Sequence, residues 1–274
     1  MAATDDILGA VRADAAAVLG DGRAKMVIGY RGRAARRMPA FITSADQAGS
    51  LIVDAECRQN LASYLRKPEV RGFRPVAIVA RPAVMRSLVL LASEGQLAAD
   101  DVLVMAVDEG VYHGLVDLPA AARLLEEKVA SLEPDAELLG RIDELAALPA
   151  EQRAAFWTEQ FSRCTRCYAC RAACPGCYCE RCIVEKNLPQ WISTAAAPHG
   201  NYAWNMIRAF HQAGRCVGCG ACEAACPQGL PLMLLNVKVG QDVLAEFGAR
   251  AGYDLEAKPV IGSWSVEDRE DYIR

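Results

Sequence analysis

Residues 164–175 read CTRCYACRAACP, and residues 216–227 read CVGCGACEAACP. Both stretches follow the spacing C-x2-C-x2-C-x3-C-P, in which three cysteines hold one 4Fe–4S cluster and the fourth reaches across to a neighbouring cluster. We call them the first run and the second run. Because the pattern occurs twice with identical spacing and with both prolines, the sequence predicts a bacterial-type dicluster ferredoxin domain built around the two runs.

The exchange of the fourth cysteine assigns four thiolates to each cluster. The expected ligands of cluster 1 are Cys164, Cys167, Cys170 and Cys226. The expected ligands of cluster 2 are Cys216, Cys219, Cys222 and Cys174. A cysteine at every third position lets one tight loop serve three corner irons of a cluster. A pair of zinc ribbons is the alternative, although zinc ribbons usually offer C-x2-C pairs rather than triples with a trailing C-P.

Four further cysteines complete the total of twelve. They are Cys57, Cys177, Cys179 and Cys182. Since twelve cysteines make three sets of four, this group predicts a third metal centre, either a 4Fe–4S cluster or zinc. The alternative is that Cys57 is a small buried apolar residue, as free cysteines often are. The spacing C-x-C-x2-C is less diagnostic than that of the runs, so both interpretations stay open.

The chain before the cysteine runs has the pattern of an α/β domain. Short apolar runs at residues 75–80 and 101–107 are typical of buried strands, and residues 82–97 and 119–132 are typical of helices. This strand–helix–strand–helix order predicts a small parallel sheet. The sequence contains neither G-x-G-x-x-G nor a P-loop, so it gives no support to a standard nucleotide site.

Residues 30–37, YRGRAARR, form the one strongly basic loop predicted in this domain. The loop follows a predicted strand, at the end where ligands of α/β proteins usually bind. Arg31 and Arg33 are therefore candidates for contact with a flavin phosphate or with an acidic partner surface. A solvated basic turn is the alternative interpretation.

These patterns divide the chain into four expected parts. They are an α/β domain at 1–135, a helical linker at 136–163, a ferredoxin-like domain at 164–250 with a helical insert at 175–215, and a C-terminal tail at 251–274. A chain of 274 residues is long enough to hold two domains with cores of their own.

Composition limits the location and the partners that we expect. The formal net charge is −4, which gives no indication of nucleic-acid binding. The sequence starts without a basic region followed by an apolar core, and its most apolar stretch, residues 87–107, is interrupted by acidic side chains. We expect a reducing, cytoplasmic location and no transmembrane segment, with docking onto a membrane complex left open.

The chain resembles the small iron–sulfur subunits of anaerobic redox complexes. The resemblance rests on residues 54–65 (DAECRQNLASYL), 76–81 (VAIVAR) and 177–182 (CYCERC), together with the two runs. The chain is similar to the beta subunits of deazaflavin-dependent hydrogenases and formate dehydrogenases, and to proteins that accompany heterodisulfide-reductase-like flavoproteins. In one respect it departs from them, because residues 82–85, PAVM, lack the cysteine that often follows this strand in the family.

The resemblance implies an electron-transfer subunit of a multi-subunit oxidoreductase, placed between a catalytic subunit and a flavin- or quinone-reactive subunit. The sequence shows no recognisable general base, nucleophile or open-site metal triad, so we expect substrate chemistry to take place on another subunit. Two alternatives stay open. One is an FAD-binding oxidoreductase subunit that uses the α/β domain, and the other is a structural zinc protein.

Overall fold

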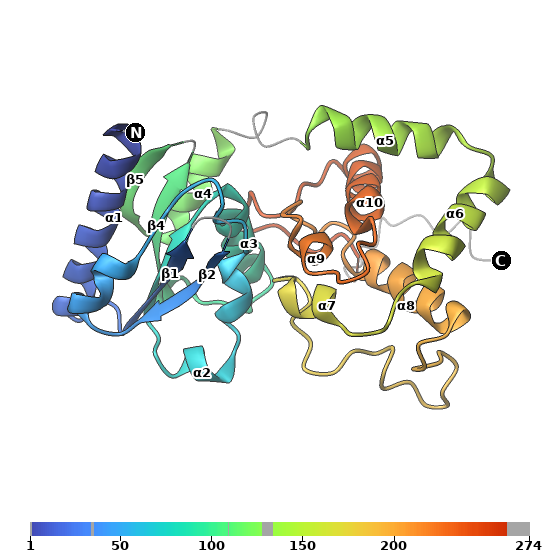
Figure 1. Cartoon of the computed structure of the whole chain (residues 1–274), viewed down its shortest axis with the longest axis horizontal. Coiled ribbons are helices and arrows are strands. Elements are labelled where there is room, and N and C mark those ends of the chain that lie inside the picture. The colour runs from blue at the N-terminus through green and yellow to red at the C-terminus, as the bar shows by residue number, and fades with distance from the viewer. Residues whose placement is uncertain (1, 34–35, 109, 128–133, 262–274) are drawn as a thin grey trace.

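The computed structural model describes residues 2–33, 36–108, 110–127 and 134–261. It contains an N-terminal α/β module and a helical, cysteine-rich module that lie side by side (Figure 1). The part of the predicted C-terminal tail from residue 262 onward lies outside the described residues.

The α/β module is built on one five-stranded sheet with the order β2-β1-β3-β4-β5. Its strands are β1 (Met26–Arg33), β2 (Arg36–Ile42), β3 (Val76–Ala80), β4 (Val102–Asp108) and β5 (Val111–Val116). The three central strands are parallel, with Ile28 opposite Ile78 and Ile78 opposite Val104. Every residue of β3 is buried, as expected for a central parallel strand with the unbroken apolar sequence VAIVA.

The sheet is mixed, so the prediction of a parallel sheet was wrong at its edges. β2 pairs antiparallel with β1, and β5 pairs antiparallel with β4. Arg33 pairs with Arg36 and Asp108 pairs with Val111, so only two residues separate the strands of each hairpin. A connection this short can join only antiparallel strands, because a parallel pair needs a long crossover. The basic loop predicted at residues 30–37 is therefore the end of a β-hairpin.

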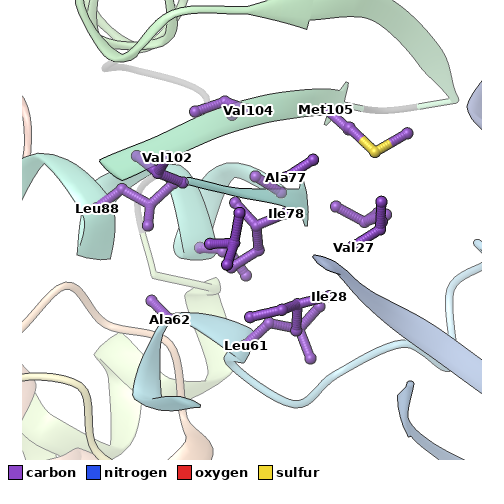
Figure 2. Close-up of a cluster of buried hydrophobic side chains, with 14 of the residues drawn as sticks. Val27, Ile28, Leu61, Ala62, Ala77, Ile78, Leu88, Val102, Val104 and Met105 are labelled. Carbon is purple, nitrogen blue, oxygen red and sulfur yellow. The ribbon is translucent and has the colours of Figure 1, made fainter. Parts of the chain in front are cut away.

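Helices cover both faces of the sheet (Figure 1). Helix α1 (Ala2–Gly20) packs on one face, whereas α3 (Pro82–Ser93) and α4 (Leu118–Glu126) pack together on the other. The short segments are the 3-10 helices at Ala45–Ser50, Leu61–Tyr64 and Ala99–Asp101 and helix α2 (Pro68–Arg71). Figure 2 shows Ile28 beside Leu61, and Ala62 belongs to the same core cluster.

The cysteine-rich module is helical. Its elements are α5 (Ala136–Ala147), α6 (Ala150–Ser162), α7 (Ala169–Ala173), α8 (Pro198–His211), α9 (Ala221–Ala224) and α10 (Leu232–Phe247). Helix α6 packs on α8, and α10 packs on α5. Trp157 and Phe161 of α6 stack with their ring centroids 5.3 Å apart and join Leu232 and Val237 of α10 in a separate core.

Side chains from both modules meet at the junction between them. The Arg215 guanidinium forms an ion pair with Glu94, with Nη2 and Oε2 2.7 Å apart. The ring of Tyr178 lies between two guanidinium groups, that of Arg66 at 4.6 Å and that of Arg215 at 4.9 Å from the ring centroid. These contacts fix the second run against the α/β module. Across the described part of the chain, every helix is too short or too polar to span a membrane.

Candidate iron–sulfur centres

The first run follows α6 and wraps around the short helix α7. Cys164 comes directly after the residue that caps α6, Cys170 lies within α7, and Cys174 caps the end of α7. Arg166 and Tyr168 have φ angles of 56° and 60°, a left-handed backbone that side chains other than glycine rarely adopt. This conformation bends the loop, and Cys164, Cys167 and Cys170 line one cavity.

The second run repeats this geometry around α9. Cys216 and Cys219 lie in the loop before the helix, Cys222 lies within it, and Cys226 follows it. Here the left-handed positions are occupied by Gly218 and Gly220, with φ angles of 71° and 69°. Glycine adopts these angles without steric cost, so the sequence of the second run suits its loop.

The structure gathers the predicted ligands into two separate cavities. One cavity, beneath α8 and α10, is lined by four cysteines of both runs: Cys164, Cys167, Cys170 and Cys226. The other cavity, which faces α3, is lined by Cys174, Cys216, Cys219 and Cys222. The exchange of the fourth cysteine follows from the packing of α7 on α9, which brings the end of each run beside the start of the other. Each cavity thus offers four thiols, the donor set of a 4Fe–4S cluster.

Hydrogen-bond donors surround the thiols. The backbone N–H of Arg166 donates to Cys164 Sγ (3.4 Å) and that of Leu230 to Cys226 Sγ (3.5 Å). The Asn236 amide donates to Cys222 Sγ at 3.6 Å. Burial raises the pKa of Cys216 to about 12 and the pKa of Cys222 to about 11. Any proton on these thiols must leave when a metal binds. The hydrogen bond from Cys177 already lowers the pKa of Cys174, the fourth thiol of this cavity.

Two buried arginines lie among the thiols. Arg166 donates from Nη1 to the Gly200 carbonyl (2.8 Å), and its guanidinium lies 5.6 Å from the ring centroids of both Tyr168 and Trp204. Arg208 of α8 lines the cavity of cluster 2 and donates from Nη2 to the Cys170 carbonyl (3.3 Å). Burial by itself would lower the pKa of Arg208, but the neighbouring thiols raise it overall. Sequence reasoning missed both arginines, because no spacing rule marks a cation inside a cysteine cluster.

The four cysteines of the predicted third centre occupy different surroundings. Cys57 is 1% exposed in the core of the α/β module, and its thiol lies 3.6 Å from Asp54 Oδ1. Cys177 lies 3.5 Å from the Gln212 amide, Cys179 is exposed, and Cys182 packs beside Trp204. Within the residues that the structure describes, no three His, Cys, Asp or Glu side chains converge on a single-ion site. The third centre stays a prediction.

A larger cavity of about 570 Å³ lies between the two modules. It opens at the carboxyl ends of β1, β3 and β4, where it is lined by Tyr30, Arg81 and Asp108. Arg58, Arg86 and Arg250 add positive charge, and Cys216 and Cys219 of cluster 2 form part of the wall. Arg81 directly follows β3, so its position at a ligand-binding edge could have been recognised from the sequence.

The arginines that the sequence marked as cofactor candidates lie elsewhere. Arg31 and Arg33 are exposed at the end of β1, in the hairpin with β2. Neither of them lines the cavity between the modules. Their contact with a flavin or with a partner stays a prediction, and their exposure suits a partner surface better than an enclosed ligand.

Comparison with known proteins identifies the class of the cysteine-rich module. Residues 163–231 match the family model described as a 4Fe-4S dicluster domain. This match confirms the dicluster domain that the two runs predicted for this part of the chain.

Curated relatives extend this result. The chain is 31% identical over 105 residues to the F420-dependent formate dehydrogenase subunit beta of Methanocaldococcus jannaschii, covering 38% of this chain and 27% of the relative. It is 34% identical over 106 residues to the F420-dependent formate dehydrogenase 1 subunit beta of Methanococcus maripaludis, covering 39% and 27%. These matches confirm the predicted resemblance to beta subunits of deazaflavin-dependent formate dehydrogenases.

A more distant similarity points to another redox assembly. The chain is 28% identical over 102 residues to the acetyl-CoA decarbonylase/synthase complex subunit alpha 1 of Methanosarcina acetivorans, covering 37% of this chain and 10% of the relative. The matched part spans about a quarter of the length of the formate dehydrogenase relatives. The similarity therefore relates part of the chain to subunits of formate dehydrogenases and of an acetyl-CoA decarbonylase/synthase complex, and it specifies no single complex.

Proposed function

We propose that this chain relays electrons through two 4Fe–4S clusters as a subunit of a multi-subunit oxidoreductase. Cys164, Cys167, Cys170 and Cys226 hold cluster 1 in this proposal. Cys216, Cys219, Cys222 and Cys174 hold cluster 2. The observation that carries the proposal is that each of two cavities is lined by one of these sets, with one cysteine exchanged between the runs.

The arrangement of the cavities suits a relay. Helix α7 contributes Cys170 to one cavity, and Cys174 at its end lines the other, so a single short helix links the two sites. When bound, a 4Fe–4S cluster accepts and releases one electron with little structural change. The chain supplies thiolates and N–H donors. The sulfur environments differ, because Cys222 of cluster 2 is buried whereas Cys167 of cluster 1 is exposed.

The two sites are covered by different parts of the chain. Tyr168 and Trp204 line the cavity of cluster 1 next to the helical insert, whereas Ser87 and Leu90 of α3 line the cavity of cluster 2. Electrons could thus enter on the side of the α/β module and leave on the side of the insert, or the reverse. We propose that catalytic and flavin- or quinone-reactive subunits occupy these two sides, by analogy with the formate dehydrogenase beta subunits.

Iron and acid-labile sulfide analysis of anaerobically purified protein tests the proposal. Two clusters require about eight iron atoms per chain, and a third 4Fe–4S centre would bring the count to about twelve. A count near four, or stoichiometric zinc with little iron, would contradict the two-cluster assignment. Anaerobic affinity purification from the native cells, followed by identification of the co-purifying subunits, tests the membership in a complex.

A second candidate function is supported by the cavity between the modules. A volume of about 570 Å³ is within the range of small-molecule sites, roughly 300–1,000 Å³. The position beyond the carboxyl ends of β1, β3 and β4 is where open α/β sheets bind ligands, and the arginines suit phosphate groups. We infer that an FAD bound here would exchange electrons with cluster 2, because Cys216 and Cys219 share the cavity wall.

Acid extraction separates this candidate from the simple relay. Acid destroys iron–sulfur clusters but leaves a non-covalent flavin in the supernatant, where its fluorescence identifies it. The informative variant is Arg81→Ala, because Arg81 lines the cavity but lies outside both cysteine sets. The FAD candidate requires flavin in wild-type extracts and less in this variant at unchanged iron content. Flavin-free protein that also fails to take up added FAD would rule it out.

A further inference from the structure

Arg208 is a buried cation without a carboxylate partner. It lies on α8 and is 4% exposed, and its Nε atom has no hydrogen-bond partner. Its Nη2 atom donates to the Cys170 carbonyl (3.3 Å). Across the part of the chain that the structure describes, no Asp or Glu forms an ion pair with it, and its electrostatic neighbours are Cys170, Cys174, Cys177 and Cys222.

Three half-buried arginines of this chain are paired with carboxylates, whereas the buried Arg166 donates to the Gly200 carbonyl instead. Arg215 forms an ion pair with Glu94, Arg74 with Asp101, and Arg171 with Glu185. The missing carboxylate needs an explanation, because an uncompensated buried charge is strongly destabilising. Arginine cannot escape the cost by losing its proton, and the groups that face its guanidinium are cysteines. Arg208 lines the cavity of cluster 2, where thiolates that hold a cluster, and the cluster itself, would supply the counter-charge.

A 4Fe–4S cluster with four thiolate ligands carries net negative charge in both redox states. Reduction adds one more negative charge. A fixed cation beside the cluster therefore stabilises the reduced state more than the oxidised state, and net charge is one of the levers that set the reduction potential. Because Arg208 lines the cavity of Cys174 and Cys222, its field acts more strongly on cluster 2 than on cluster 1.

We propose that Arg208 is the fixed counter-charge of cluster 2 and raises the reduction potential of that cluster. This inference rests on the proposed function, since it requires two clusters. It assigns Arg208 a tuning role, in which the guanidinium acts through space and ligates no iron. The unpartnered Nε is then the donor available to the sulfur atoms of the bound cluster.

Redox titration monitored by electron paramagnetic resonance tests the proposal with three variants. Arg208→Gln removes the charge and keeps a hydrogen-bonding side chain, Arg208→Lys keeps the charge, and Lys238→Gln removes an exposed charge on α10. We expect Arg208→Gln to lower the midpoint potential of cluster 2 more than that of cluster 1. Arg208→Lys should restore most of the shift, and Lys238→Gln should leave both potentials at their wild-type values.

Iron analysis of each variant separates failure of this inference from failure of the proposed function. If wild-type protein contains far fewer than about eight irons per chain, the proposal of two clusters fails. A fully loaded Arg208→Gln protein with an unchanged cluster 2 potential would overturn only the role of Arg208. If Arg208→Gln loses cluster 2, retention of that cluster in Arg208→Lys supports the counter-charge, whereas its loss in both variants overturns it in favour of a purely structural role.

Discussion

The two cysteine runs have the same spacing but meet the same backbone requirement with different residues. In the second run, Gly218 and Gly220 take the left-handed conformation, and a Cβ atom at either position would meet nothing within 4 Å. The first run places Arg166 and Tyr168 there, with φ angles of 56° and 60°. Glycine is therefore favoured at these positions by backbone conformation, since space is available for a side chain.

Side-chain contacts in the first run compensate for the strain of its left-handed backbone. A left-handed conformation costs roughly 1–2 kcal/mol for a residue other than glycine. Arg166 offsets this cost through its hydrogen bond to the Gly200 carbonyl (2.8 Å), and Tyr168 packs edge-on against Trp204 with centroids 5.1 Å apart. Both contacts tie the first run to the helical insert. The second run is instead held by the α/β module, through Arg215 and Glu94.

Replacing the fourth cysteine of either run with serine gives the largest expected effect. Cys174→Ser should remove cluster 2 although Cys174 belongs to the first run, and Cys226→Ser should remove cluster 1. Each variant should fall from about eight to about four irons per chain. Electron paramagnetic resonance spectra of the reduced proteins check which cluster is lost.

Local variants provide the controls for these replacements. Cys167→Ser should remove the cluster 1 signal and Cys219→Ser the cluster 2 signal, because each of these cysteines serves its own run. If the spectrum of Cys174→Ser matches that of Cys167→Ser, each run ligates its own cluster and the crossed assignment is wrong.

Some features of this protein could be predicted from its sequence, and others could not. The dicluster domain could be predicted because cysteine spacing is local and is set by the chemistry of the cluster. The mixed sheet was missed because the two-residue hairpin connections lack the Asn-Gly or Asp-Gly signal of tight turns. Arg208 was missed because burial depends on how α8 packs over both runs, and the cavity was missed because Tyr30, Asp108 and Tyr253 are distant in sequence.

Cys57 tests how the second run is joined to the α/β module, because it lines the same cavity as Cys216 and Cys219. Burial raises the pKa of its thiol to about 11, so a neutral thiol is the resting form at neutral pH. If Cys57 is only a small buried residue of the core, Cys57→Ser should keep its full iron and zinc content and lose about 1–3 kcal/mol of stability, the cost of burying a hydroxyl. Metal analysis and thermal unfolding check both expectations.

Loss of metal from Cys57→Ser would instead support the third centre. A thiolate ligand shared with Cys177, Cys179 and Cys182 would make metal binding part of the docking energy between the modules. The variant would then lose metal and become sensitive to protease between the modules. Cys179→Ser provides the matched control, because that exposed cysteine belongs to the same predicted set.

Replacing a glycine of the second run tests the backbone requirement by itself. Gly218→Ala should destabilise the loaded protein by roughly 1–2 kcal/mol, because alanine must adopt the left-handed conformation without any compensating contact. Gly140→Ala, in the middle of α5, should instead stabilise the protein by up to about 1 kcal/mol through helix propensity. Opposite signs in thermal unfolding would locate the effect in the backbone angle, and equal signs would contradict it.

Moving glycine into the first run gives the smallest net effect, because two terms oppose each other. Arg166→Gly relieves roughly 1–2 kcal/mol of left-handed strain, but it removes a buried charged hydrogen bond worth about 1.5–3 kcal/mol. We therefore expect a net loss of only about 1 kcal/mol, or about 2–4 °C in the apparent melting temperature measured at a fixed scan rate. The reverse change, Gly218→Arg, introduces the strain without the Gly200 carbonyl and should be more destabilising. If Arg166→Gly raised the melting temperature, the contacts of Arg166 would not compensate for its backbone, and the first run would differ from the second for another reason.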